Sequence, residues 1–350
     1  MGGRVTAAIL VVLAAACSGS KGGGVGGADG GGGGGDGGGG DEGGTSAAEA
    51  CSTRATAYCA KLQGCSSYRM QISYGDQTTC VTRQTANCTA SLAAPSTGTT
   101  TTTVEACAAA YPGWVCAEFL SDQNIPAGCA QTMGTLAAGA GCVAAGQCTT
   151  GYCSIVPGAA CGVCATAPTA GASCAQVTTC GPGLDCTTDT QDCVVEGGSG
   201  ASCGKGAVCA SGFSCEGADE SKGVMGTCQA SLTTSGATCD PNQQTTPACD
   251  RDSLLTCNTQ TKTCATLAIA GGGQPCGTND VNDQTAVCGT DGTCTGASTG
   301  VPGTCTAAAA DGQPCDLVNG PGCLTLSRCI ASGDGGTAGT CQALNPMGCQ

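Results

Sequence analysis

The density and spacing of cysteine residues constrain this chain more than any other feature. Cysteine makes up 35 of the 350 residues, the level at which disulfides rather than a large apolar core hold a fold together. Only eight aromatic residues are present, and the alanines that inflate the hydrophobic fraction each bury little apolar area. The sequence therefore predicts a small disulfide-rich fold.

A competing interpretation is a metal-binding protein that uses cysteine thiolates. Zinc sites of that kind combine CxxC pairs, often with histidine. This chain has no histidine and one CxxC, formed by Cys161 and Cys164, so disulfides are favoured and no metal or other cofactor is expected. The net charge of −14 leaves no surplus of Lys and Arg to neutralise phosphates, so no nucleic-acid partner is expected either.

Residues 1–16 have the three parts of an export signal. Arg4 supplies the positive charge, residues 5–13 form the apolar segment, and three alanines precede Cys17. The apolar run of about twelve residues is too short to span a bilayer as a permanent helix. Export would deliver the chain to an oxidising compartment, in agreement with the disulfide interpretation.

Cys17 resembles the lipidated cysteine of bacterial lipoproteins. In that family a leucine and two small residues precede a cysteine that is lipidated and becomes the first mature residue; here the leucine, Leu13, lies one place earlier. The resemblance implies anchoring to the lipid bilayer through Cys17, and Ser18 implies the outer membrane. Several acyl chains would make such an anchor stable. The residues leave open an ordinary cleavage before Cys17 that produces a free thiol.

Residues 17–45 are predicted to be a lipidated, flexible tether. Within them, residues 22–44 contain 17 glycines in 23 positions. Such a segment cannot bury enough surface to offset its ordering entropy, and as a flexible coil it spans roughly 30 Å.

Residues 46–131 are predicted to form a helical module with eight cysteines. Ser46 and Glu49 form a capping-box pattern, and Gly64 can end the helix that follows. Cysteines eight or nine residues apart share a helix face but cannot bond to each other, so each must bond to a neighbouring segment. Three short helices joined by four disulfides are expected, with residues 97–103 as a loop. The eight cysteines are Cys51, Cys59, Cys65, Cys80, Cys88, Cys107, Cys116 and Cys129.

Residues 132–350 contain six repeats. Each repeat opens with Gly-x-x-Cys and then has three more cysteines, and first cysteines lie 29 to 39 residues apart. Repeats of this kind are expected to contain irregular short strands and to form an extended, bead-like array. The first two quartets are Cys142, Cys148, Cys153 and Cys164, then Cys174, Cys180, Cys186 and Cys193; the later quartets begin at Cys203, Cys239, Cys276 and Cys315.

An even number of cysteines is left for disulfide formation if lipidation occupies the thiol of Cys17. Of the remaining 34, the helical module uses eight and the quartets use 24. Cys161 and Cys349 are left over, and are expected either to pair or to close local loops. Each quartet allows three connectivities, of which first-to-third with second-to-fourth, the interleaved knot of small extracellular modules, is favoured.

The segment QCTTGYC, residues 147–153, and the cysteine spacing around it resemble the repeats of the Dickkopf N-terminal type. The order of lipidated cysteine, tether, helical eight-cysteine module and repeats is similar to that of predicted cysteine-rich outer-membrane lipoproteins of myxobacteria and related Gram-negative groups. This resemblance implies the scaffold and the location. It implies no signalling partner of the kind that Dickkopf proteins have.

No catalytic residue is expected. Histidine, the usual general base, is missing, and the thiols are assigned to disulfides. The remote exception is thiol–disulfide exchange at Cys161 and Cys164, whose surroundings lack a thioredoxin-type βαβ pattern. A calcium site at Asp280, Asn282 and Asp283, followed by Asp291 and Gly292, is weighed against ordinary turn chemistry, which is favoured.

Two functions from different classes remain. The first is a non-catalytic interaction or adhesion module that recognises a protein or a glycan. The second is a passive structural or protective component of the cell envelope. An exposed aromatic or apolar patch would favour the first.

Overall fold

The computed structural model describes residues 45–350, except 176–178, 188, 280–283, 299–300, 334–335, 344, 346, 348 and 350. The predicted export signal, Cys17 and nearly all of the tether therefore lie outside the described residues. Within that range, none of the helices has the length and hydropathy needed to cross a bilayer. The fold is small and disulfide-rich, with a helical module followed by irregular short strands, and the expected fold class is confirmed.

The helical module contains more helices than the three expected. Each of the first four begins where a Ser, Asp or Thr side chain accepts a hydrogen bond from the backbone N–H three residues later, the usual device for starting a helix. The helices are α1 (Ala47–Cys65), α2 (Ser67–Ser73), α3 (Gln77–Leu92), α4 (Thr101–Ala110) and α5 (Cys116–Leu120), with short 3₁₀ turns at Tyr111–Gly113 and Ala127–Cys129. Two further 3₁₀ turns, Ala145–Gln147 and Glu220–Lys222, lie in the first and third repeats.

The expectation of a loop over residues 97–103 is wrong from Thr101 onward. Thr100 Oγ1 accepts from the Thr103 N–H at 3.2 Å, and Thr103 Oγ1 accepts from the Thr100 N–H at 3.0 Å. This reciprocal capping starts α4 inside the threonine run. The helix then ends at Ala110, before Pro112, so Cys107 and Cys116 belong to different helices.

Four disulfides hold the helical module together. Cys51–Cys88 and Cys59–Cys80 join α1 to α3, and the reversed order of the bonded residues shows that the two helices are antiparallel. The other two bridges are Cys65–Cys116 and Cys107–Cys129. Between them lies an aromatic core in which ring centroids of Tyr58, Tyr111, Trp114 and Phe119 are 5.4–6.3 Å apart.

The repeats form small sheets with the strand orders β1-β3-β2, β4-β5, β6-β8-β7, β10-β9, β11-β13-β12-β15-β14 and β16-β18-β17. Most neighbouring strands are antiparallel, and β11 and β13 are parallel. The strands are β1 (Gly141–Cys142), β2 (Cys153–Ser154), β3 (Gly162–Cys164), β4 (Leu184–Cys186), β5 (Cys193–Val195), β6 (Ser202–Cys203), β7 (Phe213–Glu216), β8 (Gly226–Ala230), β9 (Leu255–Asn258), β10 (Thr263–Thr266), β11 (Ala268–Ala270), β12 (Pro275–Asn279), β13 (Gln284–Cys288), β14 (Thr293–Thr295), β15 (Gly303–Thr306), β16 (Pro314–Asp316), β17 (Ser327–Ala331) and β18 (Ala338–Ala343).

The opening glycine of each repeat has a structural role. All six have φ between 79° and 85°, a region that residues with a side chain rarely adopt. In each repeat this glycine donates its N–H to the carbonyl of the fourth cysteine at 2.7–2.9 Å, and the fourth cysteine donates back to the residue after the glycine. The Gly-x-x-Cys pattern therefore marks a turn that ties the start of a repeat to its end.

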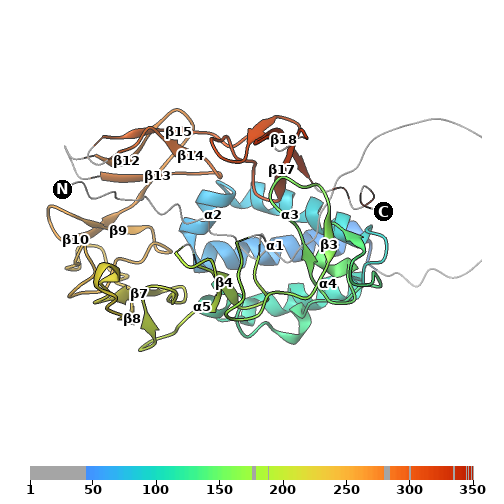
Figure 1. Ribbon diagram of the computed structural model, residues 1–350, viewed down its shortest axis with the longest axis horizontal. Coiled ribbons are helices and arrows are strands. Elements are labelled where there is room, and N and C mark those ends of the chain that lie inside the picture. Colours follow the sequence, from blue (N-terminus) through green and yellow to red (C-terminus); the bar gives the residue numbers. More distant parts are fainter. Residues whose placement is uncertain are drawn as a thin grey trace, which may run out of the picture.

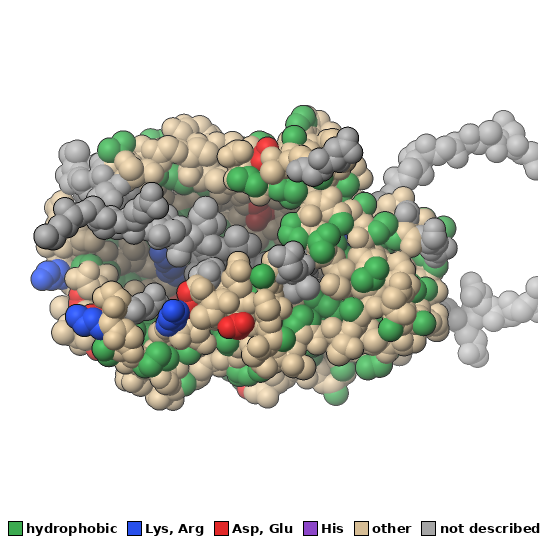
Figure 2. All heavy atoms as spheres, viewed as in Figure 1, with side chains coloured by type: hydrophobic (Ala, Val, Ile, Leu, Met, Phe, Trp, Pro, Cys, Tyr) green, Lys and Arg blue, Asp and Glu red, His purple; other side chains and the backbone are tan. Residues whose placement is uncertain are grey.

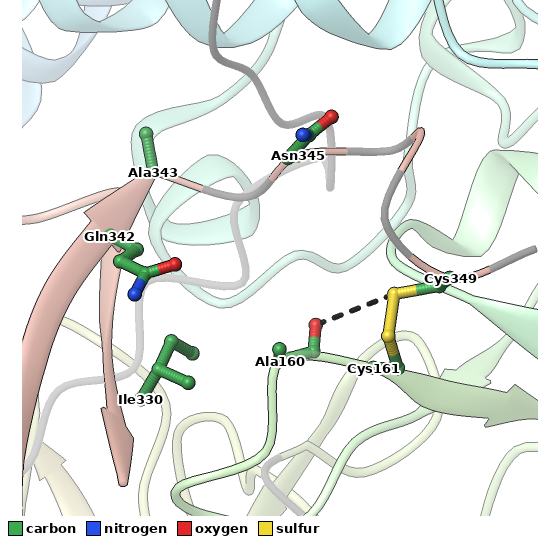
Figure 3. A pocket seen from close by; sticks show the side chains of 7 residues that line it. All are labelled: Ala160, Cys161, Ile330, Gln342, Ala343, Asn345 and Cys349. Carbon is green, nitrogen blue, oxygen red and sulfur yellow. Dashed lines mark hydrogen bonds between the residues drawn. A yellow bond between two sulfur atoms is a disulfide. The ribbon is translucent and has the colours of Figure 1, made fainter. Parts of the chain in front are cut away.

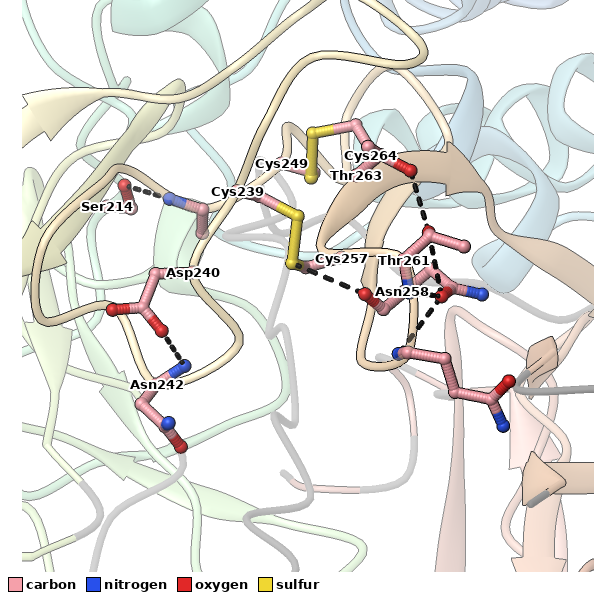
Figure 4. Close-up of a disulfide and its surroundings, with 12 residues drawn as sticks. Ser214, Cys239, Asp240, Asn242, Cys249, Cys257, Asn258, Thr261, Thr263 and Cys264 are labelled. Carbon is pink, nitrogen blue, oxygen red and sulfur yellow. Dashed lines mark hydrogen bonds between the residues drawn. A yellow bond between two sulfur atoms is a disulfide. The ribbon is translucent and has the colours of Figure 1, made fainter.

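All six quartets have the first-to-third and second-to-fourth connectivity that the sequence favoured. The third and fourth cysteines lie directly opposite each other on neighbouring strands, yet each bonds to an earlier cysteine. The fourth repeat is an example, with Cys239–Cys257 beside Cys249–Cys264 (Figure 4). Cα separations across the quartet bridges are 5.4–6.0 Å, within the ordinary range.

The repeats do not form the extended array that we expected from the sequence. They lie around the helical module, which occupies the middle of the molecule (Figure 1). Gln147 of the first repeat donates to Pro95 O at 3.1 Å, and Thr290 of the fifth repeat donates its N–H to Gln71 O at 3.0 Å. These hydrogen bonds attach the first and fifth repeats directly to the helical module.

Candidate functional site

The structure pairs every cysteine that we predicted to form a disulfide. Each of the eight in the helical module and each of the eight in the first two quartets has a partner in its own module or repeat. The two leftover cysteines, Cys161 and Cys349, bond to each other across 188 residues. This bridge joins the first repeat to the C-terminal end of the chain.

The CxxC sequence does not form a disulfide between its own two cysteines. Cys161 bonds to Cys349, whereas Cys164 bonds to Cys148 and is 2% exposed. A thioredoxin-type exchange centre requires the two cysteines to alternate between a shared disulfide and two thiols. That arrangement is not the one in the structure.

Sulfur atoms of the quartets come close enough together to resemble a metal site. The Sγ atoms of Cys142, Cys148 and Cys164, for example, lie within 4.8 Å of one another. Metal coordination requires thiolates, and all three sulfurs belong to disulfides. Their proximity follows from two interleaved bridges in one small repeat.

The acidic residues considered for calcium are only partly described. Asp280, Asn282 and Asp283 lie outside the described residues, and Asp291 is included in them. The Asp291 carboxylate accepts a hydrogen bond from the Thr325 N–H, while its own N–H donates to Ile72 O. Burial raises the pKa of Asp291 to about 6. Asp291 thus connects the fifth repeat to the sixth repeat and to α2.

The first and sixth repeats meet and close the series of repeats into a ring around the helical module. This junction is the candidate site. Here the Ala331 N–H of the sixth repeat donates to Gly158 O of the first repeat at 3.0 Å. The Leu317 side chain packs so closely on Gly158 that a Cβ there would meet it at 2.9 Å. The Cys161–Cys349 disulfide lies beside these contacts, so non-covalent and covalent links between the first and last repeats occur together.

Three exposed aliphatic side chains lie at this closure: Val156, Leu317 and Val318, which we call the closure patch. They are 51%, 40% and 72% exposed. Val156 is in the turn that also carries Gly158, because the Ala159 N–H donates to Val156 O at 3.1 Å. On the face shown in Figure 2, hydrophobic side chains form several separate groups with few charged side chains among them.

One carboxylate of the fourth repeat anchors the repeats to the helices. Asp252 is 3.4 Å from the Arg69 guanidinium and accepts hydrogen bonds from Ser66 Oγ at 2.6 Å and Ser211 Oγ at 2.5 Å. Ser66 and Arg69 belong to the helical module, and Ser211 belongs to the third repeat. Asp252 therefore holds three parts of the chain at one point.

A second anchor, Arg83 of α3, holds the sixth repeat. Its guanidinium donates to Thr325 O at 2.6 Å and to Ser327 Oγ at 2.9 Å, and lies 3.4 Å from Asp311. We did not identify Arg69, Arg83 or Asp252 from the sequence. The chain has only 11 Lys and Arg residues, and no local pattern distinguishes the ones whose partners are distant in sequence.

Near the Arg69 anchor, two carboxyl groups have raised pKa values. Burial raises the pKa of Asp122 to about 7; Arg69 opposes the shift and Glu196 adds to it. Burial likewise raises the pKa of Glu196, against a hydrogen bond from Ser121. In both groups the largest effect is loss of hydration of the charged form.

Replacing Asp122 by asparagine should stabilise the protein at pH 8 and have little effect at pH 4. An aspartate in the unfolded chain has a pKa of about 3.9. Between about pH 4 and 7, Asp122 is therefore protonated in the folded state and ionised in the unfolded state. The free energy of unfolding falls as pH rises through this range. At pH 8 the gain should be between about 1 and 4 kcal/mol. Asparagine tolerates the positive φ of this residue, 49°.

Urea unfolding followed by the fluorescence of Trp114, which is the single tryptophan and lies in the helical core, measures this difference. The control is Asp189→Asn in the second repeat, because Asp189 is exposed and its replacement removes no buried carboxyl group. A gain of equal size at pH 4 and pH 8 would show that ionisation of Asp122 does not limit stability.

Comparison with known proteins identifies no relative of this chain. No family model, curated protein or solved structure matches it. The function is therefore argued from the residues and contacts described above.

Proposed function

We propose that this protein is an exported lipoprotein, anchored through Cys17 to the cell envelope at the outer membrane, and that it acts as a non-catalytic interaction module. The observation that carries the proposal is the closure patch on a disulfide-held frame. Exposed apolar side chains that lie together are typical of binding surfaces, and Val156, Leu317 and Val318 come from two repeats far apart in sequence.

The loop that carries Leu317 and Val318 of the closure patch is ordered by hydrogen bonds to one carboxylate. Asp316 accepts hydrogen bonds from the N–H groups of Val318 and Asn319, both at 2.8 Å, and from Thr337 Oγ1 at 2.9 Å. The two backbone N–H groups lower the pKa of Asp316. A loop ordered before binding loses little further entropy when a partner arrives, which supports a recognition role.

The side chains of the patch suit a protein partner better than a glycan. All eight aromatic residues are buried or half-buried, and none of them belongs to the closure patch, so the patch offers no ring on which a sugar could stack. Aliphatic side chains gain affinity by removing apolar area from water, and a complementary apolar surface on a protein provides that area. We therefore infer a protein partner in the envelope.

Replacing Leu317 and Val318 by aspartate should abolish capture of this partner. The experiment is chemical crosslinking in intact cells that express the full lipidated chain, followed by identification of the crosslinked proteins. Val115→Asp is the matched control, because Val115 is 59% exposed and lies in the helical module. The proposal expects a reproducible crosslinked protein with the original chain and the control, and at least a tenfold loss with L317D/V318D.

Equal capture by L317D/V318D would show that the closure patch is not the contact surface. No reproducible partner for the original chain would favour a passive protective role, the second candidate. That role is supported by the 17 disulfides, because cross-links restrict the local opening that proteases require.

A further inference from the structure

Cys161–Cys349 differs from the other 16 disulfides in its exposure. Cys161 is the one cysteine of the described residues that is exposed, and Cys349 is half-buried. Fifteen of the other bridges contain at least one buried cysteine, and in Cys65–Cys116 both cysteines are half-buried. Since thiol–disulfide exchange requires access to a sulfur atom, Cys161 is the most accessible position for attack.

A cavity opens beside this bridge. It has a volume of about 180 Å³, and Figure 3 shows the disulfide on one side of it, Gln342 on the opposite side and Asn345 between them. Ala160 and Ile330 complete the lining from the first and sixth repeats. Polar amide groups beside an exposed sulfur provide a site that a small, polar thiol compound can enter.

Cys161–Cys349 also differs in what it connects. Each of the other 16 bridges lies within the helical module or within one repeat, whereas this bridge joins the first repeat to residues beyond the sixth. Among the described residues, the same junction also has non-covalent links, which include the Ala331–Gly158 hydrogen bond and the Leu317 packing. Breaking this bridge therefore removes the covalent link between the first repeat and the residues beyond the sixth without removing a disulfide from any repeat.

We propose that Cys161–Cys349 is a thiol-exchangeable clasp that controls opening of the ring between the first and sixth repeats. An external thiolate attacks Sγ of Cys161 and forms a new S–S bond, the Cys161–Cys349 bond breaks, and Cys349 leaves as a thiolate that takes a proton from water. A second thiol can then displace the first, which leaves Cys161 reduced and releases the disulfide of the two external thiols. This proposal does not depend on the proposed function.

Graded addition of glutathione to the full oxidised chain tests the clasp. After an acid quench, free thiols are alkylated, and peptide mass spectrometry locates both the alkyl group and the glutathione. The expected first product carries glutathione on Cys161 and a free thiol at Cys349, formed at least tenfold faster than any other. Hydrogen exchange at the Ala331 N–H should accelerate at least tenfold in the same product, because its acceptor is on the other side of the opened junction.

Two paired variants serve as controls. C161S/C349S should lose the first product, keep the other 16 bridges oxidised and show fast exchange at Ala331 without any thiol. C65S/C116S, which removes the other bridge without a buried cysteine, should leave the first product unchanged. First reaction at Cys65 and Cys116, simultaneous reaction of many bridges, glutathione on Cys349, or unchanged exchange at Ala331 would each overturn the proposal.

Discussion

Replacing Cys17 by serine should move the protein from the membrane fraction to the soluble fraction. Serine keeps the size of the side chain but removes the thiol that carries the lipid, and the part of the chain that the structure describes has no helix able to cross a membrane. Membrane binding by several acyl chains is effectively stable, and it is lost when they are absent. We expect at least nine-tenths of the serine variant in the soluble fraction after cell lysis, measured by fractionation and immunoblotting.

A matched variant separates anchoring from sorting. In the lipoproteins that the N-terminus resembles, aspartate after the lipidated cysteine is avoided in outer-membrane members, so Ser18→Asp should leave the protein membrane-bound but shift it to the inner membrane. Intact mass spectrometry of the original chain should show a mass increase that corresponds to acylation at Cys17. Membrane-bound C17S, or an unacylated mature chain, would refute the anchor.

Removing the Cys59–Cys80 bridge should cause the largest loss of stability among single disulfides of the helical module. Both cysteines are fully buried, join α1 to α3 and belong to the same core cluster as Trp114. Loss of a native disulfide typically lowers the free energy of unfolding by about 2–5 kcal/mol, and the missing sulfur atoms add a cavity term. For a module of this size the melting temperature should fall by about 10–20 °C.

Near-ultraviolet circular dichroism of Trp114 in the C59A/C80A variant measures this effect, because the indole lies inside the affected core. C161A/C349A is the control, since it removes an exposed bridge outside the helical module. We expect its Trp114 transition to stay within a few degrees of the original chain. Equal shifts in the two variants would mean that burial does not determine the contribution of a bridge.

Local chemistry explains why the repeats could be predicted in detail. The four cysteines of a quartet lie within a few tens of residues, and an opening glycine fixes a turn against the fourth cysteine. Spacing alone leaves three connectivities for each quartet, and the one that the structure has was favoured by its likeness to the interleaved knot of small extracellular modules. The start of α4 was not predicted from the threonine run. The hydroxyl groups of Thr100 and Thr103 cap a helix in a segment whose composition is typical of a loop.

The sequence by itself determined the disulfide-rich class, the helical module and the six quartets, because each depends on residues that are close together along the chain. It also determined which two cysteines are left over, because these are the ones outside the module and the quartets. Tertiary structure alone decided that the repeats surround the helices, and that Cys161–Cys349 closes the ring beside the closure patch. Those features depend on contacts such as Arg83 with Thr325 and Arg69 with Asp252, between groups more than 180 residues apart. Sparse charges with distant partners leave no periodic pattern in a sequence, and only the folded chain brings them together.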